Sequence, residues 1–120
     1  MLYEIRNVRQ IKNEGKRRWF TDLNYDLIVW YDMEKQDEIV GFQLCYDKES
    51  VEKALTWRKG KGYSHNKIDS GEQRESVKRS PVLMPDGIFN KKDVLKKFEK
   101  AAQNIDPDTK DFIFHLIKEY

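Results

Sequence analysis

The densest group of side chains that could do chemistry lies between residues 63 and 72. His65 is followed by Asp69 and Glu72, and an imidazole with two carboxylates could bind one metal ion or act as an oriented general base. The spacing matches no established motif. The carboxylates could equally accept backbone N–H groups in the turn at residues 69–71, and this structural interpretation is favoured. We therefore assign no catalytic residue, cofactor or metal ligand.

A basic loop precedes this group. It runs from Arg58 to Gly62, between the aromatic residues Trp57 and Tyr63. Basic side chains contact phosphates and exposed aromatic rings stack on bases, so a nucleic-acid-associated protein using residues 58–67 is one alternative. A solvated hairpin tip with Trp57 in the core is the favoured interpretation. If the chain has a functional surface, we expect it among Trp57, Arg58, Lys59, Lys61, Tyr63, His65, Asp69 and Glu72.

Three further positions carry weaker signals. Cys45 is the single cysteine and has no neighbouring histidine in sequence, so a buried, unreactive thiol is expected. His115 follows Asp111 by four residues, which indicates a surface pair on a helix. Arg17 and Arg18 are adjacent, and on a strand they would point to opposite faces, so they cannot form one basic patch.

Composition indicates one ordinary domain. The chain has 120 residues, of which 37% are charged, with 23 basic and 21 acidic residues. This near balance of basic and acidic residues indicates a surface with salt bridges between charged side chains. It does not by itself indicate binding to nucleic acid. The single cysteine excludes an internal disulfide, and no run approaches the roughly 20 apolar residues of a membrane span. No secretory leader is recognisable at the start. We expect a cytoplasmic protein with one domain over residues 1–120.

Apolar alternation predicts an antiparallel meander of four to six strands. The continuous apolar run within Asp26–Asp32 predicts a central strand whose two faces are both covered. Glu38–Tyr46 alternates cleanly. Residues 47–57 are ambiguous between helix and strand, and strand is favoured from Lys53 onwards. The remaining candidates are residues 2–9, Lys16–Thr21, Lys53–Arg58 and Tyr63–Ile68.

Two amphipathic helices are expected at the end of the chain. Asn90 suits the N-cap of the first, and Asp106 with Pro107 suits the start of the second. Both helices must cover one sheet face, which predicts an α+β fold. The three tryptophans cannot all be assumed to lie under two short helices, so a two-fold dimer through an uncovered aromatic face is expected. The predicted core comprises Val40, Phe42, Leu44, Leu95, Phe98, Phe112 and Leu116.

Several phrases of the chain together resemble a group of small bacterial proteins without an assigned function. The resemblance covers most of the chain and implies no activity, cofactor or partner. It draws attention to the segment from Trp57 to Glu72. The phrases are those at residues 18–20, 27–30, 41–47, 54–57, 65–72 and 81–84.

The function expected from these observations is a small, non-catalytic binding or protein-interaction module. No complete catalytic, nucleotide-binding or metal motif occurs in the sequence. Two alternatives stay open. One is a nucleic-acid-associated protein using the basic hairpin, and the other is a small enzyme or metal protein using His65, Asp69 and Glu72. No partner, substrate or pathway follows from the residues.

Overall fold

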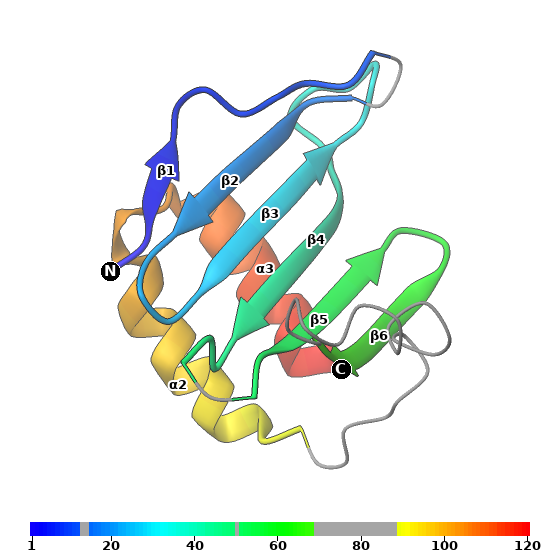
Figure 1. Ribbon diagram of the computed structural model, residues 1–120. Coiled ribbons are helices and arrows are strands. Elements are labelled where there is room, and N and C mark those ends of the chain that lie inside the picture. Colours follow the sequence, from blue (N-terminus) through cyan, green and yellow to red (C-terminus); the bar gives the residue numbers. More distant parts are fainter. Residues whose placement is uncertain (13–14, 50, 69–88) are drawn as a thin grey trace, which may run out of the picture.

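The computed structural model describes residues 1–12, 15–49, 51–68 and 89–120. Six strands form one antiparallel sheet in chain order, followed by two α-helices and a short 3-10 helix (Figure 1). The α+β meander with two C-terminal helices is thus confirmed. The elements are β1 (Tyr3–Ile5), β2 (Arg17–Thr21), β3 (Asp26–Tyr31), β4 (Ile39–Tyr46), β5 (Lys53–Arg58), β6 (Gly62–Lys67), α2 (Lys91–Ala101), η3 (Ala102–Asn104) and α3 (Pro107–Glu119).

Short turns with suitable residues produce the meander. The Asp22 carboxylate accepts the backbone N–H groups of the residues two and three positions later, at 2.8 and 2.7 Å. Asp32 does the same before β4, at 3.0 and 2.9 Å. Between β5 and β6, Gly60 has φ 81°, a left-handed conformation that glycine adopts without strain. These local bonds favour antiparallel pairing of consecutive strands.

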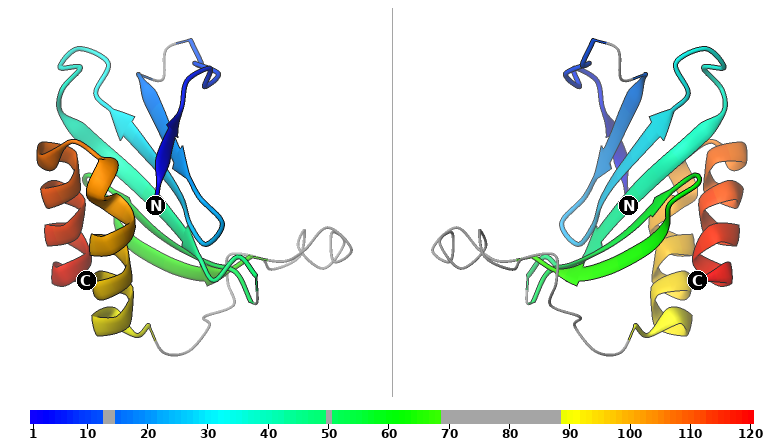
Figure 2. Two further views of the ribbon diagram at one scale, coloured as in Figure 1. Left: turned by 90° about the vertical axis from the view of Figure 1, so that its left-hand side faces the viewer. Right: turned by 90° about the vertical axis from the view of Figure 1, so that its right-hand side faces the viewer.

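Both helices lie on the same side of the sheet (Figure 2). The side chains that alternate towards them are buried, among them Leu27, Val29 and Phe42, each with no exposed surface. The helices contribute one stripe each, centred on Phe98 and Ile113. The predicted caps are also present, since Asn90 accepts from the backbone of Asp93 and Asp106 from that of Thr109. In the described part of the chain, no helix is long and apolar enough to cross a bilayer.

A β-bulge shifts the start of β4. Trp30 pairs with Gly41, but the next residue, Tyr31, pairs with Ile39, so Val40 is an extra residue on its strand. Such an insertion breaks the alternation of side chains. Ile39 is consequently buried and Val40 is half-buried. The prediction of Val40 as a core residue is therefore wrong.

One stripe of side chains along α3 is buried. Its centre is Thr109, Ile113 and Ile117, which follow one another at four-residue spacing and are all buried. Phe112 flanks this stripe and is 39% exposed, so its prediction as core is wrong. Leu116 is half-buried against the core, and Leu95 of α2 is too.

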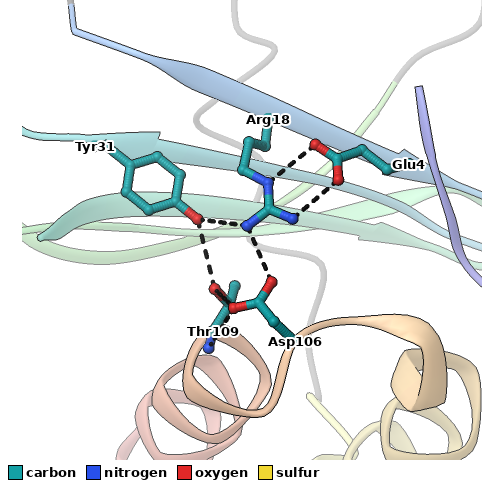
Figure 3. A network of polar contacts seen from close by, with 5 residues as sticks. All are labelled: Glu4, Arg18, Tyr31, Asp106 and Thr109. Atoms are coloured by element: carbon teal, nitrogen blue, oxygen red, sulfur yellow. Dashed lines mark hydrogen bonds and ion pairs between the residues drawn. The ribbon is translucent and has the colours of Figure 1, made fainter. Parts of the chain in front are cut away.

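A polar network connects the first three strands to the start of α3 (Figure 3). Arg18 donates two hydrogen bonds to the Glu4 carboxylate, at 2.9 and 3.0 Å, and one each to Tyr31 and Asp106, at 3.2 and 3.0 Å. Asp106 also accepts from the Thr109 hydroxyl at 2.6 Å. The network holds the edge of the sheet against the helical layer.

Candidate functional site

Three side chains of the surface predicted between Trp57 and Glu72 lie on the sheet face that the helices cover. Strand alternation turns Trp57, Tyr63 and His65 towards the helices. The Tyr63 hydroxyl donates to the backbone oxygen of Leu116 at 2.8 Å, and Trp57 packs edge-on against Phe112 with ring centroids 5.8 Å apart. These aromatic side chains therefore hold α3 on the sheet.

His65 belongs to an aromatic cluster at the end of α3. Its Nε2 atom shares a hydrogen bond with the Tyr46 hydroxyl, and its ring centroid lies 4.9 Å from that of Phe89. Asp69 and Glu72 lie outside the described residues, so their grouping with His65 stays a prediction. Within the described ranges, no three His, Cys, Asp or Glu side chains gather closely enough to hold a metal ion.

The basic hairpin residues have different surroundings. Lys59 forms an ion pair with Glu38, and this carboxylate raises the pKa of the lysine. Lys61 is exposed in the turn. Arg58 points to the opposite sheet face from Trp57, because successive strand residues alternate. At this hairpin, Lys59 is thus paired with a carboxylate, and Arg58 lies on the sheet face away from the helices.

The sheet face opposite the helices has an apolar half, which we term the open face. It is carried by β1, β2 and β3, with Gly41 of β4 and Arg58 of β5 at its border. Two of the three tryptophans lie here, whereas Trp57 lies under the helices. Trp19 is 38% exposed and Tyr3 61%. The described part of the open face consists of Tyr3, Ile5, Arg17, Trp19, Ile28, Trp30, Gly41 and Arg58.

This finding corrects the expectation that both faces of β3 are covered. Leu27, on the face towards the helices, is completely buried. On the other face, Ile28 and Trp30 are only half-buried. The two described helices, α2 and α3, both pack on the face that carries Leu27 (Figure 2). The apolar run of β3 therefore supplies both a core surface and an apolar outer surface.

The Arg58 guanidinium lies over the ring of Trp30. Its Cζ atom is 4.1 Å from the centroid of the indole ring, a distance typical of a cation–π contact. The two residues are on strands separated by β4, where Gly41 is the residue between them. A Cβ atom on Gly41 would lie 3.1 Å from Arg58 Cδ and 3.2 Å from Trp30 Cε3. The absence of a side chain at Gly41 gives the contact its space.

Arg17 borders Trp30 on the other side, as its register partner in β2. The Gln10 side chain accepts a hydrogen bond from the Arg17 backbone N–H at 2.9 Å and donates one to the Arg17 backbone oxygen at 3.0 Å. It thus makes the pair of hydrogen bonds that the backbone of a neighbouring strand would make. Arg17 Nη2 donates to the backbone oxygen of Arg9. Among the described residues, no carboxylate forms an ion pair with Arg17 or Arg58.

The acidic groups at the far end of β3 have local partners. Asp26 accepts hydrogen bonds from Thr21, at 2.5 Å, and from Lys48, at 3.3 Å. Burial raises the pKa of Glu52, and the charge of Asp26 adds to this effect. Burial likewise raises the pKa of Cys45 to about 12, which keeps the thiol protonated. The expected buried and unreactive cysteine is consistent with this environment.

Two hollows differ in chemistry. One, of about 750 Å³, lies between Tyr25 and α2, and its lining mixes acidic residues such as Asp22 with lysines such as Lys97. The other, of about 300 Å³, lies on the open face beside Trp19 and Arg17. The second hollow is the more selective for an anionic ligand, because its charged lining residues are all cationic.

Comparisons with protein families, with curated proteins and with solved structures find no match. The site must therefore be interpreted from its own geometry. The sequence contains a signal for the open face, namely that Trp19, Ile28 and Trp30 alternate with the core residues. Recognising it requires the strand register.

Proposed function

We propose that this protein is a non-catalytic protein-interaction module that binds its partner through the open face. The observation that carries the proposal is the row of Arg17, Trp30 and Arg58. It combines an aromatic ring with two cationic groups that no described carboxylate neutralises. Trp and Arg are the residue types that dominate binding energy in protein interfaces.

The chemistry of this row defines the partner surface. Apolar side chains of the partner would cover Trp19, Ile28 and Trp30. Carboxylates of the partner would neutralise Arg17 and Arg58. The cation–π contact orients the Arg58 guanidinium before binding, so less side-chain freedom is lost when a carboxylate arrives. The best-suited partner is thus a segment with acidic residues beside large apolar ones.

Nucleic acid is the second candidate, because a tryptophan and arginines on a sheet face can also bind a single strand. The ion pair of Lys59 with Glu38 argues against it, since phosphate binding favours a continuous basic track. Oligonucleotide binding that weakens steeply between low and physiological salt would support this alternative. It should then be abolished by Lys59→Glu combined with Lys61→Glu.

The test is a selection from a displayed peptide library with the intact protein. We expect enrichment of peptides with acidic residues next to aromatic or large aliphatic ones. The same peptides should lose binding to Arg58→Glu and to Trp19→Ala. Lys61→Glu is the matched control, because it makes the same type of charge change in the same hairpin but away from the open face.

Three outcomes would oppose the proposal. The selection could yield no enriched peptides, or peptides that bind wild type and Arg58→Glu equally. Light scattering could instead show a stable dimer that Trp19→Glu dissociates, which would identify a second copy of this chain as the occupant. That last result would confirm the dimer expected from the sequence and replace the acidic partner.

A further inference from the structure

The hollow on the open face lies between the sheet and the chain that follows β1. Ile5, Trp19 and Ile28 are register neighbours on three adjacent strands, and they form its floor. Val8 and Arg9, a few residues beyond the end of β1, line it from the other side. The volume is about 300 Å³, at the lower limit of ordinary ligand sites.

The lining combines apolar surface with positive charge. Ile5, Val8 and Ile28 are half-buried, and Trp19 is more exposed. The charged lining residues are Arg9 and Arg17. Neither has an ion-pair partner among the described carboxylates. An uncharged apolar ligand would leave these cations uncompensated, whereas an anionic group next to an apolar one would satisfy both parts.

The hollow is held open by bonds that precede any ligand. Gln10 is fixed on the backbone of Arg17, and the Arg17 guanidinium donates to the backbone oxygen of Arg9. Arg17 Nε is buried without a hydrogen-bond partner. Buried polar atoms are seldom left unsatisfied, and each exception requires an explanation. The Arg17 guanidinium is thus held in place beside the hollow before any ligand binds.

We infer that this hollow receives one large apolar side chain of the bound partner, with a carboxylate immediately beside it held by Arg17 and Arg9. The inference rests on the proposed function and makes it more specific. It predicts a ligand class, namely an apolar group of about the size of a phenyl or isobutyl group carrying a carboxylate. A ligand of the same shape that carries an ammonium group should not bind, because its positive charge would lie next to those of Arg17 and Arg9.

The test uses two small probes of matched shape. Sodium 4-phenylbutanoate and 4-phenylbutylamine are titrated separately into the intact ¹⁵N-labelled protein, and the indole N–H signal of Trp19 is followed by NMR. We expect a saturable shift with the carboxylate and none with the amine. In Arg17→Gln the carboxylate should bind about tenfold more weakly, the effect of losing one charge-assisted hydrogen bond.

A second variant protects the test against misfolding. Arg9→Gln removes the other charge but retains the backbone oxygen of residue 9, which accepts the hydrogen bond from Arg17. It should also weaken carboxylate binding, and Lys61→Gln should not. Equal shifts with both probes, or carboxylate binding unchanged in both arginine variants, would overturn the inference.

The two proposals can fail separately. If displayed peptides bind through Arg58 but phenylbutanoate leaves the Trp19 signal unmoved, the hollow is not used and the interaction module stands. If phenylbutanoate binds through Arg17 but no peptide is enriched, the hollow is a small-molecule site and the protein-partner proposal fails.

Discussion

Arg58 and Trp30 stack on each other across an intervening strand, with Arg58 Cζ 4.1 Å from the centroid of the indole ring. The contact passes over Gly41, which has no side chain to separate them. It lies on the sheet face away from the helices, so it contributes little to the hydrophobic core. In the proposed function, this contact would hold the Arg58 guanidinium in place for a partner.

Gly41→Ala should disturb this contact. The new methyl group would lie 3.0 Å from the Trp57 backbone oxygen as well as close to both stacked side chains. Crowding of this kind typically destabilises by about 1–3 kcal/mol. Urea unfolding should show that loss, and the enriched peptides should bind more weakly. Wild-type stability together with wild-type binding would mean that Gly41 is not needed to space the two side chains.

Leu44→Ala should be strongly destabilising, because Leu44 lies in the centre of the core with no exposed surface. We expect a loss of about 2–5 kcal/mol in the free energy of unfolding. Val40→Ala is the comparison on the same strand. It should cost only about 1 kcal/mol, because the bulge leaves Val40 half-buried. Equal losses at both positions would contradict the bulge.

Arg18→Met should make stability less dependent on pH in acid. The hydrogen bond from Arg18 lowers the pKa of Glu4. Burial opposes ionisation of Asp106, but hydrogen bonds from Thr109 and Arg18 outweigh it and lower the pKa of Asp106 as well. Carboxylates with lowered pKa values stabilise the fold above their ordinary pKa values, and this stabilisation is lost as the pH falls through the lowered ones.

The variant should therefore lose about 1–2 kcal/mol at pH 7, near the low end for charge-assisted bonds, because Glu4 and Asp106 are 42% and 45% exposed. The difference from wild type should shrink below about pH 4. Denaturant unfolding at several pH values measures it. A difference that stays constant down to pH 2 would show that the carboxylates are not responsible.

Cys45 should react slowly with Ellman's reagent at pH 8. Burial, with the charges of Glu52 and Asp26, raises its pKa from 9.0 to about 12, and the thiolate is the reactive form. The thiol should react rapidly once the protein is unfolded in guanidinium. Because the folded pKa is the higher one, stability should also decline as the pH rises above 9. Rapid reaction of the native protein would contradict this environment.

The parts of the fold that follow from local patterns could be predicted. The strand from Lys53 to Arg58 has the predicted bounds, and Asn90 and Asp106 cap the two helices. Apolar alternation and capping depend on neighbours in sequence, and one chain displays them.

Features that depend on pairing between strands could not be predicted. The bulge at Val40 appears only when β3 and β4 are aligned. The contact of Arg58 with Trp30 requires the registers of three strands and a glycine in the middle one. Trp57 and Arg58 were grouped because they are adjacent in sequence, whereas strand alternation places them on opposite faces. Among the described residues of the predicted surface, Trp57 thus lies against the helices and Arg58 on the open face.

The most direct test of the interaction module is to map where an enriched acidic and apolar peptide binds. An NMR titration of the ¹⁵N-labelled protein should shift the signals of the open face, above all Trp19, Ile28, Trp30 and Arg58. The signals of α2, α3 and the turn at residues 59–61 should stay in place. Shifts concentrated on the helices or on that turn, with the open face unaffected, would contradict the account.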